Sequence, residues 1–407
     1  MGKILYISYD GMTDQLGQSQ VIPYLIGLSK AGHDITLISF EKEPVLKKKK
    51  KVIDELLSLN NIHWRPLLYT KRPPVLSTMF DLNSMKALAV KLHKKDHFDI
   101  VHCRSYIAAI TGLFMKRNFG IKFIFDMRGF WADERIDGGL WKMSNQLYRS
   151  IYRYFKYKER EFFTEADYII SLTDAGKAEI ANILKPQLPR PIKVIPCCSD
   201  IELFSKKAVN SDLKDRFIKE MGIQKEDFIL SYLGAIGTWY MLDEMLQFFA
   251  SMLLKMPHAK FLFITNESPS SILKAAMAKG IAADRIIIRE AARSEVPAML
   301  DCSHLAIFFI RPTYSKIASS PTKLGEIMSM GIPVICNSGI GDVVLNVGEC
   351  GAVIHEFNDQ EYDQVIANIS ALLAIPPDRI RQQAINFFSL DKGIQAYSDV
   401  YSVVLGK

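Results

Sequence analysis

Lys323 and Glu326 are the residues whose types and spacing most directly suggest chemistry in this sequence. They stand three positions apart in a segment that we predict to be helical, with Ser320 as its N-cap and Pro321 as its first residue. At 100° per residue, the lysine and the glutamate share one edge of that helix. A diphosphate at the helix start would suit the cation, and the carboxylate one turn later offers two acceptors to neighbouring hydroxyls, as on a ribose. The alternative is an i,i+3 ion pair on a solvated face.

The helix that carries this pair has a clear apolar side and a clear end. Leu324, Ile327 and Met328 form its apolar arc, so the edge with the charged residues would face a cleft rather than the core. Gly331 is expected to end the helix in the left-handed conformation after about two and a half turns. The apolar run 332–336 then predicts a buried strand.

The pattern Pro321-Thr322-Lys323-x-x-Glu326, followed by a small-residue turn and a proline-containing strand, resembles the donor-sugar-nucleotide signature of glycosyltransferase family 4. These are retaining glycosyltransferases of the GT-B fold. In the family a second glutamate often lies eight residues before this one, and here that position is Ala318. The departure leaves the ribose contact on Glu326 in place and removes a carboxylate from the sugar ring. The resemblance implies that the nucleotide-diphosphate sugar contacts Ser320, Thr322, Lys323 and Glu326, with Lys323 also acting in catalysis.

A loop with two glycines, 234–239, follows the strand predicted at 228–233 and leads into a helix at about Tyr240. Its spacing is not Gly-x-Gly-x-x-Gly, and an ordinary strand-to-helix turn explains the glycines equally well. In the family this loop approaches the donor phosphates, often with an arginine and a lysine that this loop lacks. The resemblance implies phosphate contacts from Gly237 and Thr238, a base contact from Arg289, and charge supplied instead by Arg311, Lys316 and Lys323.

Short apolar strands alternate with helical patterns along the whole chain, which predicts parallel sheets covered on both faces by helices. The resemblance accordingly implies an α/β protein of the GT-B fold, with two Rossmann-like, doubly wound parallel-sheet domains facing a cleft. The predicted strands are 4–8, 32–38, 62–69, 98–102, 121–126, 166–172 and 192–196 in the first half, and 228–233, 260–265, 285–288, 305–310, 332–336 and 352–355 in the second.

The segment 194–204 resembles the family's inter-domain hinge, in which Asn-Gly commonly stands where Cys197-Cys198 does here. Near the end of the chain, Phe388-Ser389-Leu390 resembles the segment that crosses back to the first domain. We therefore predict an acceptor-binding domain over 1–204, a nucleotide-sugar-binding domain over 205–386, and a C-terminal helix over 387–407 that returns to the first domain.

Two polar regions of the first domain are candidates for acceptor binding. The loop 10–20 lies between the first strand and a helix predicted over 21–30, and it contains Gly17 and Gln18, for which an ordinary turn is the alternative. His102 and Arg104 end a later strand. Polar residues just past buried parallel strands gather at the ligand-binding edge of a doubly wound sheet.

Asp126 ends the next strand and is followed by Arg128 and Glu134. The family places its acceptor site and a catalytic His or Asp in this region. The resemblance makes Asp126 the candidate for the group near the reacting hydroxyl, with Arg128 as its charge partner. A structural salt bridge that links Asp126, Arg128 and Glu134 is the alternative.

Two basic stretches raise the question of a membrane. Lys47–Lys51 opens a helix that reaches Leu59, and a long aromatic and basic helix is predicted over 140–165, where Arg149, Arg153 and Lys156 share one face. Such residues suit an anionic membrane surface, and a solvated or domain-packing face is the alternative.

Composition limits the remaining classes. The chain has 407 residues, 49% of them hydrophobic, which is enough for two domains. Its formal net charge of +7 suits phosphorylated ligands. The sequence shows no nucleic-acid-binding pattern. No Asp-x-Asp is present, His93 and His97 lack the glutamate of a zincin motif, and no metal site is expected. The six cysteines show no paired spacing, and the first apolar run is too short for a signal peptide, so we expect a cytoplasmic protein, peripheral on the inner face of the plasma membrane if it binds one.

The resemblance therefore implies a metal-independent hexosyltransferase of bacterial polysaccharide or glycolipid biosynthesis. It would move a sugar, with retention, from a nucleotide-diphosphate sugar to a saccharide or lipid-linked acceptor. No separate cofactor is expected, and a UDP-sugar is favoured over a GDP-sugar as co-substrate. The alternatives are a sugar-nucleotide epimerase of the same fold and a catalytically silent, membrane-associated scaffold.

Overall fold

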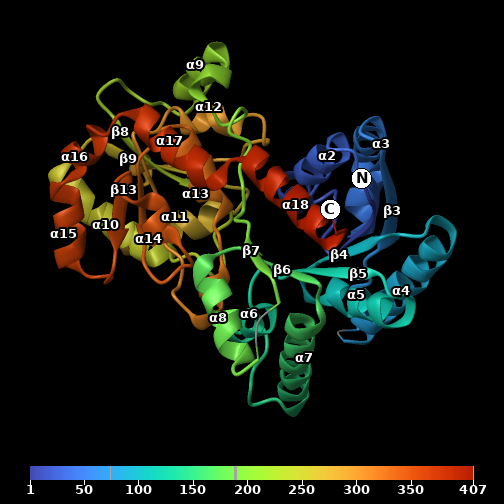
Figure 1. Cartoon of the computed structure of the whole chain (residues 1–407). Coiled ribbons are helices and arrows are strands. Elements are labelled where there is room, and N and C mark those ends of the chain that lie inside the picture. Colours follow the sequence, from blue (N-terminus) through green and yellow to red (C-terminus); the bar gives the residue numbers. More distant parts are fainter. Residues whose placement is uncertain (74, 188–189, 407) are drawn as a thin grey trace. The chain divides into compact units, whose positions relative to one another are not determined.

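The computed structural model describes residues 1–73, 75–187 and 190–406 (Figure 1). The chain forms two compact units. Unit 1 consists of Met1–Pro196, Ile317–Ser319 and Leu390–Lys407, and unit 2 of Cys197–Lys316 and Ser320–Ser389. The ranges 1–204, 205–386 and 387–407 stay our prediction for the functional domains.

Unit 1 is built on a seven-stranded parallel sheet in the order β3-β2-β1-β4-β5-β6-β7. All seven strands predicted for the first half are present, with ends that differ by a few residues. Their bounds are β1 Lys3–Ser8, β2 Asp34–Glu41, β3 Ile62–Leu68, β4 Ile100–Arg104, β5 Lys122–Asp126, β6 Tyr168–Ser171 and β7 Ile192–Val194.

Helices flank this sheet, and two of them differ from our prediction. The loop predicted over 10–20 contains a short helix, and the long helix predicted from residue 140 begins at Gln146, where the Asn145 side chain accepts a hydrogen bond from the Leu147 N–H. The helices of unit 1 are α1 Gln15–Gln20, α2 Ile22–Lys30, α3 Glu43–Leu59, α4 Leu76–Asp96, α5 Ser105–Phe119, α6 Trp131–Asp137, α7 Gln146–Glu165, α8 Asp174–Leu184 and α18 Leu390–Val404.

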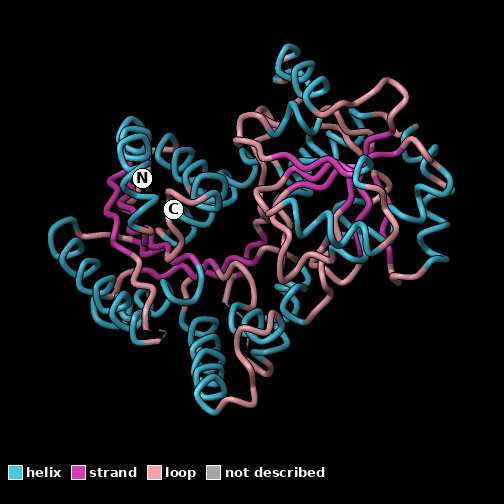
Figure 2. Tube along the Cα trace, turned by 180° about the vertical axis from the view of Figure 1, so that it is seen from behind, coloured by secondary structure: helices cyan, strands magenta, loops and turns pink. Residues whose placement is uncertain are grey.

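Unit 2 repeats the arrangement with a six-stranded parallel sheet in the order β10-β9-β8-β11-β12-β13. Figure 2 shows the strands of the chain gathered into these two sheets, each with helices beside it. All six strands predicted for the second half are present, although β11 is three residues shorter than expected. They are β8 Phe228–Leu233, β9 Ala259–Ile264, β10 Ile286–Arg289, β11 Leu305–Ile307, β12 Val334–Asn337 and β13 Gly351–Ile354.

The helix predicted after Ser320 is α13, Thr322–Ser329. It starts one residue later than predicted, with Pro321 in the N-cap position, and Gly331 has the expected positive φ of 71°. The end of α13 is held by Arg381, whose guanidinium donates to the carbonyl oxygens of Ser329, Phe204 and Ile201. The helices of unit 2 are α9 Ser211–Glu220, α10 Leu242–Lys255, α11 Pro269–Ala278, α12 Val296–Leu300, α13 Thr322–Ser329, α14 Val343–Val347, α15 Asp359–Ala367, α16 Ile369–Leu373 and α17 Pro377–Phe388, with 3-10 turns at Lys206–Ala208, Ala283–Arg285 and Tyr314–Ala318.

The strands at the centre of each sheet are mostly apolar because both faces of a parallel sheet are covered, and polar residues come at or near their carboxyl ends. Every residue of β4 and of β12 is buried. Each unit has its own core, in which aromatic side chains such as Phe123 and Phe162 in unit 1, or Phe249 and Phe261 in unit 2, lie between sheet and helices. Among the described residues, no helix is both long enough and apolar enough to cross a membrane.

Candidate donor and acceptor sites

Each sheet has one point where the strand order reverses, and in doubly wound folds the ligand lies outside the carboxyl ends of the strands at such a point. In unit 1 the reversal falls between β1 and β4, and in unit 2 between β8 and β11. Most of the predicted site residues follow these four strands or their neighbours. The topology therefore brings together residues that are far apart in the sequence.

In unit 2, the loop after β8 is bound to the segment after β11. The N–H of Met241 donates to the Phe309 carbonyl oxygen at 3.0 Å, and the N–H of Arg311 donates to that of Trp239 at 2.8 Å. These two backbone bonds place the loop 234–240 beside the segment that leads into α13. Gly234 has a φ of 112°, which an L side chain rarely adopts, so this position of the loop requires glycine.

Lys323 lies in the first turn of α13 and is buried, with 7% of its surface exposed. Its Nζ donates to the Tyr232 hydroxyl at 3.0 Å and lies 3.6 Å from the centroid of the Tyr240 ring. A Cβ on Gly234 would come within 3.1 Å of the same atom. Burial holds the pKa of this ammonium well below its usual range, and the nearby Glu326 carboxylate opposes the shift only in part.

Glu326, also 7% exposed, forms an ion pair with Arg293 in which Nη1 lies 2.8 Å from Oε1. Burial raises the pKa of its carboxyl, while Arg293 acts in the opposite direction. Because Glu326 and Lys323 are both buried, the alternative of an ion pair on a solvated face is wrong.

The other predicted donor residues lie around this centre at different depths. Ser320 does not cap α13, because its hydroxyl accepts a hydrogen bond from the Cys197 N–H at 3.1 Å. Lys316 is buried with its Nζ 3.7 Å from the centroid of the Trp239 ring. Thr322 is half-buried, whereas Gly237, Thr238 and Arg311 are exposed on the two segments joined by the backbone bonds.

Arg289 is the predicted donor residue that the topology leaves apart from this group. It ends β10, which is separated from β8 by β9, and its Nη2 donates to the carbonyl oxygen of Glu220 at 2.7 Å. A base contact from Arg289 stays a prediction. The contact that the structure does give it is with the end of α9.

In unit 1, Asp126 is fully buried at the end of β5. Its Oδ2 accepts a hydrogen bond from the Tyr397 hydroxyl at 3.0 Å and lies 3.6 Å from Nε2 of His102. The expected ion pair with Arg128 is present, with Nη1 3.8 Å from Oδ1. Burial raises the pKa of this carboxyl, but the attraction of Arg128, His102 and Arg104 outweighs burial, so the pKa lies below its usual value.

His102 is buried beside this carboxylate, and its Nδ1 lies 2.8 Å from the Tyr401 hydroxyl. Burial is the main cause that lowers the pKa of the imidazole, so the ring is neutral at pH 7. The stronger acceptor next to the ring is the Asp126 carboxylate, so we place the proton on Nε2, with the Tyr401 hydroxyl donating to Nδ1. Asp126 and His102 thus lie in the interior of unit 1 rather than at its surface.

Arg104 and Arg128 connect this buried group to the carboxyl edge of the sheet. Arg104 ends β4 and its Nε donates to the Asp10 carboxylate at 3.2 Å, where Asp10 is partly exposed. Arg128 has a φ of 60°, which is uncommon for a residue with a side chain. A backbone conformation of this kind persists only where the surrounding contacts hold it in place, and such residues are frequent at functional sites. Asp10, Arg104, Asp126 and Arg128 lie at or just after the carboxyl ends of β1, β4 and β5.

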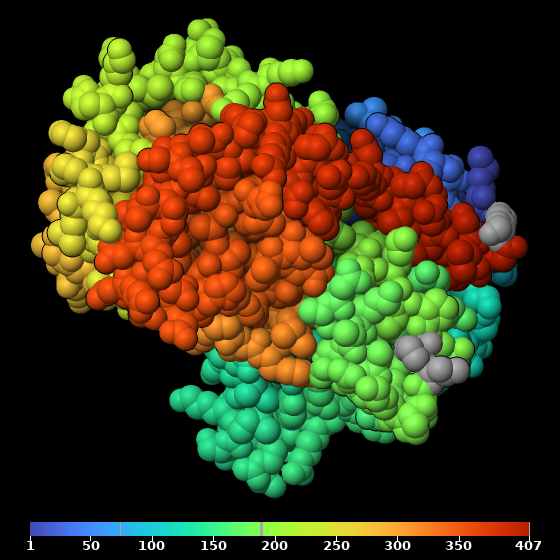
Figure 3. All heavy atoms as spheres, turned by 60° about the vertical axis from the view of Figure 1, so that its left-hand side comes forward, coloured from blue at the N-terminus to red at the C-terminus, as the bar shows by residue number. Residues whose placement is uncertain are grey.

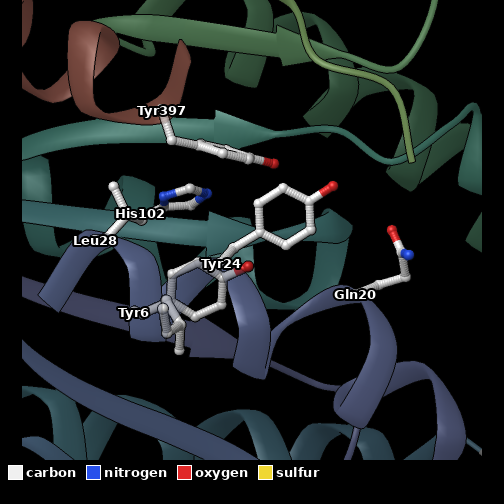
Figure 4. Close-up of a pocket in the computed structure, with 7 residues that line it drawn as sticks. Tyr6, Gln20, Tyr24, Leu28, His102 and Tyr397 are labelled. Atoms are coloured by element: carbon white, nitrogen blue, oxygen red, sulfur yellow. The ribbon is translucent and has the colours of Figure 1, made fainter. Parts of the chain in front are cut away.

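A narrow pocket without room for a water molecule adjoins this network (Figure 4). The Tyr397 ring from α18 lies 5.5 Å, centroid to centroid, from the His102 ring and 5.4 Å from that of Tyr24 on α2. The pocket is largely aromatic and apolar, with one amide and one imidazole. Its lining residues are Tyr6, Gln20, Tyr24, Leu25, Leu28, His102 and Tyr397.

The predicted acceptor residues Gly17 and Gln18 lie on α1 rather than in an open loop. A Cβ on Gly17 would overlap with the carbonyl oxygen of Gly11, so glycine is needed here for close packing. Gln18 donates from Nε2 to the Thr13 carbonyl oxygen at 3.0 Å. The turn is fixed further by the buried Glu41, which accepts hydrogen bonds from Met12 N, Thr13 N, Thr13 Oγ1 and Ser39 Oγ.

The basic face predicted for α7 is only partly solvated. Arg149 donates to the Met143 carbonyl oxygen, and Lys156 pairs with Asp133 at 2.8 Å and with Glu159. Two of the three cations that we placed on one face of this helix thus have partners within unit 1, and Arg153 is exposed. α7 lies at the surface of unit 1, where its blue-green atoms are visible in Figure 3.

Several residues of these sites had no signal in the sequence by themselves. Tyr397, Tyr401, Glu41 and Arg293 come from segments distant from the residues they contact, and no motif marks them. Glu41 is a partial exception, because it stands at the end of a predicted apolar strand, where a carboxylate would be buried. A buried charge needs hydrogen-bond partners, so this position could have indicated a polar contact. The tyrosines of α18 could be found only from the position of that helix.

Three comparisons place the chain among known proteins. Residues 21–203 match the model of the family described as Glycosyltransferase Family 4. Over 408 residues the chain is 21% identical to UDP-Gal:alpha-D-GlcNAc-diphosphoundecaprenol alpha-1,3-galactosyltransferase of Escherichia coli, with 95% of this chain and 96% of the relative covered.

Two solved structures agree in fold. A glycosyltransferase from Rickettsia africae superposes with a TM-score of 0.71 at 15% identity, over 99% of this chain and 98% of that one. HepE of Anabaena, in complex with UDP-glucose, superposes with a TM-score of 0.69 at 13% identity, over 99% and 100%. With its two parallel Rossmann-like sheets the chain has the GT-B fold, and it is a glycosyltransferase whose residues 21–203 match the model of Glycosyltransferase Family 4.

Proposed function

We propose that this protein transfers a hexose from a nucleotide-diphosphate sugar to a hydroxyl group of a lipid-linked saccharide. UDP-sugars are favoured over GDP-sugars as donors. The transfer retains the anomeric configuration and uses no metal ion. The E. coli relative is named for a UDP-sugar donor and a diphosphoundecaprenol-linked acceptor, and HepE was solved with UDP-glucose, which supports these choices.

The observation that carries the proposal is the gathering of charge at the switch point of unit 2. The ammonium groups of Lys316 and Lys323 lie beside the loop after β8, and Lys323 stands in the first turn of α13. A leaving nucleoside diphosphate gains negative charge as the glycosidic bond breaks. Two ammonium groups and a helix N-terminus stabilise that charge, so they favour the transition state over the ground state.

Glu326 lies one turn further along α13 and is assigned to the ribose. Its carboxylate already accepts from Arg293, and the second oxygen is available to a pair of vicinal hydroxyls. Burial raises the pKa of the Glu326 carboxyl, and the Arg293 guanidinium acts against that shift. An ionised carboxylate binds hydroxyl groups more strongly than a neutral acid does.

On the acceptor side, unit 1 offers the group around Asp126 at the carboxyl ends of β1, β4 and β5. Asp126 is buried, so in this proposal it acts on the acceptor through Arg128 and Arg104, whose charges it holds in place. The direct catalytic role predicted for Asp126 and Arg128 stays a prediction. Gly17 and Gln18 shape the neighbouring turn.

The experiment is a hydrolysis and transfer assay with a panel of UDP- and GDP-sugars. We expect slow release of free sugar from one UDP-sugar without acceptor, and faster consumption when a lipid-linked saccharide is added. A new sugar nucleotide epimer would replace the proposal with the epimerase alternative. Neither turnover nor nucleotide binding with any donor would favour the silent scaffold.

A lipid-linked acceptor would be reached at an anionic membrane surface, and α3 is the helix best suited to bind one. Lys47–Lys51 are exposed on it, and Val52, Leu56 and Leu59 form an exposed apolar stripe on the same helix, with Leu59 exposed to 82%. Cations attract anionic headgroups and the stripe adds apolar contact. The sequence suggested both α3 and α7 for binding to an anionic membrane surface, and of the two we propose α3.

A further inference from the structure

Large apolar side chains are exposed together where β3 ends and α4 begins, at the outer strand of the unit 1 sheet (Figure 1). Leu68 is the last residue of β3 and Tyr69 follows it, while Leu76, Met79 and Phe80 stand at the start of α4. The three α4 residues are exposed to 63%, 56% and 64%, and they share one face of the helix. These five residues form the apolar patch. Single exposed apolar residues are ordinary, whereas a group of them marks an interaction surface.

The apolar character of the α4 surface is confined to the start of the helix. Farther along the same face stand Asn83, Ala87 and Lys91, which are exposed as well but are polar or small. α4 begins after the carboxyl end of β3 and leads back to the start of β4, so its first turn lies at the carboxyl edge of the sheet. The apolar patch therefore belongs to that edge of unit 1.

Contacts within unit 1 hold the apolar patch close to the proposed acceptor site. The Tyr69 ring centroid lies 5.6 Å from that of Tyr9. The buried carboxylate of Asp81 accepts hydrogen bonds from the Tyr9 hydroxyl at 2.8 Å and from the Thr70 N–H at 3.1 Å. Tyr9 immediately precedes Asp10, one of the charged residues at the acceptor edge. The patch and the acceptor site thus share one edge of one sheet.

The chain around the apolar patch is cationic. Between residues 60 and 80 the sequence contains no aspartate or glutamate. It contains Arg65, Lys71 and Arg72, and all three are exposed. The first carboxylate after this stretch is Asp81, which is buried. Basic residues therefore border the patch in the chain.

The lysine run of α3 adds positive charge at the same edge. α3 follows the carboxyl end of β2, the neighbour of β3, and Nζ of Lys49 donates to the Thr13 carbonyl oxygen in the loop after β1 at 3.3 Å. The five lysines outnumber the three acidic residues of the helix, Glu43, Asp54 and Glu55. The net charge of α3 is therefore positive.

An exposed apolar surface with a cationic border matches the interface of an anionic bilayer. Apolar side chains reach the acyl chains there, and cations meet the phosphate groups of the lipids. We propose that the apolar patch inserts into an anionic phospholipid membrane, so that the carboxyl edge of the unit 1 sheet faces the lipid. The inference rests on the proposed function for the acceptor site at this edge. It goes beyond the binding proposed for α3, because it names the side chains that enter the bilayer.

The first test is co-sedimentation of Met79→Ser with Phe80→Ser, as a double variant, with vesicles of phosphatidylcholine and phosphatidylglycerol. Loss of two inserted side chains should weaken binding about 10- to 100-fold and remove the part that persists in high salt. The matched control is Leu254→Ser with Met277→Ser, which removes two exposed apolar side chains from unit 2 and should bind as wild type does. Thermal melts and UDP affinity should be unchanged in both double variants, since all four side chains are exposed.

A second test reports on insertion at one position. The six cysteines of the chain are buried, so a thiol introduced at an exposed site can be labelled selectively with an environment-sensitive dye. We expect the label on Phe80→Cys to gain fluorescence with these vesicles and to be quenched by lipids that carry a quencher in their acyl chains. A label on Leu254→Cys should show neither change.

Several results would overturn the inference. Wild type that does not bind the vesicles, a Met79 and Phe80 double variant that binds them as wild type does, or a Phe80 label that does not respond would each refute insertion. A double variant that loses self-association in sedimentation velocity but keeps vesicle binding would show that the patch joins two copies of the chain instead.

Failure of this inference is distinct from failure of the proposed function. Transfer from a UDP-sugar to a detergent-solubilised lipid-linked saccharide would uphold the proposed function even if the patch does not enter vesicles. Absence of binding to both UDP and GDP would refute the proposed donor site, and with it the acceptor role on which the inference rests, whatever the vesicles show.

Discussion

The hydroxyl of Tyr397 donates a hydrogen bond of 3.0 Å to Oδ2 of Asp126, although 271 residues separate them in the sequence. Tyr397 lies on α18, and Asp126 ends β5. Tyr401, one turn further along α18, contacts His102 in the same way. The last helix of the chain therefore contributes two hydroxyl groups to the buried polar group of unit 1.

Tyr397→Phe should lower the free energy of unfolding by about 1.5–3 kcal/mol, because it removes a hydrogen bond to a buried charged group. Urea denaturation followed by circular dichroism measures this change. Tyr157→Phe, at an exposed tyrosine of α7, is the control and should change stability little. Equal effects of the two substitutions would contradict a special role for the bond to Asp126.

Asp126→Asn is nearly isosteric, and we expect it to abolish transfer to acceptor while UDP still binds. The reason is that Asp126 belongs to unit 1, whereas the residues assigned to the nucleotide belong to unit 2. Calorimetry with UDP and the transfer assay measure the two properties separately. Loss of UDP binding together with a lower melting temperature would show that the carboxylate is needed for folding only.

His102→Gln should make stability less dependent on pH between about pH 7 and 5. Burial lowers the pKa of His102 in the folded state below the value of about 6.5 in the unfolded chain. The unfolded chain thus takes up a proton first, and this contribution to stability is present above pH 6.5 and lost as the pH falls. The slope attributable to one such group reaches about 1.4 kcal/mol per pH unit.

Urea midpoints at several pH values test that prediction, and His63→Gln, at an exposed histidine, is the control. The Asp126 carboxyl also makes the protein less stable as the pH falls, but at lower pH. Its pKa is lowered in the folded state, so its contribution to stability is lost only when the carboxylate takes up a proton. An unchanged slope in His102→Gln between pH 7 and 5 would mean that His102 is not the group that titrates.

Glu326→Gln should weaken UDP binding by about 1–3 kcal/mol, the cost of losing charge-assisted hydrogen bonds to hydroxyl groups. Folding should change little, because Arg293 is 37% exposed and can be solvated when its partner is neutral. Isothermal titration calorimetry gives the affinity. Glu349→Gln is a control that removes the carboxylate of another ion pair of unit 2, with Arg379. Unaltered UDP affinity in Glu326→Gln would limit Glu326 to its pairing with Arg293.

Gly17→Ala should destabilise unit 1 by about 1–3 kcal/mol, the usual cost of an overpacked contact. The added Cβ would overlap with the backbone of Gly11, which cannot move without disturbing the hydrogen bonds that Glu41 makes to the same turn. Thermal denaturation measures the effect. Gly120→Ala is a poor comparison because of its positive φ, so Gly237→Ala, where nothing lies within 4 Å, serves as control.

Binding to anionic vesicles should fall when Lys48 and Lys50 of α3 both become glutamate. Each basic residue near an anionic surface contributes about 1 kcal/mol, and the part due to charge weakens in high salt. Lys206→Glu with Lys207→Glu makes the same change of charge on exposed residues of unit 2 and should have less effect. Co-sedimentation that is equal with neutral and anionic vesicles would point to a soluble acceptor.

The alternation of strands and helices could be predicted from the sequence, because apolar runs that are buried on both faces can be recognised locally. The sequence also located Lys323, Glu326, Asp126 and Arg128, since each stands just after a predicted strand or in the first turns of a predicted helix. Helix ends were less certain, as the start of α7 and the short α1 show, because capping and close packing such as that of Gly17 depend on neighbours.

What these residues contact depends on the fold and could not be predicted from their positions in the sequence. Lys323 and Glu326 share a helix edge, which in sequence suggests that they pair with each other. In the fold, Lys323 lies on Tyr240 and Glu326 pairs with Arg293. Such contacts join segments that are distant in the chain, and they arise because parallel strands bring their carboxyl ends to one edge of a sheet whatever their separation in sequence.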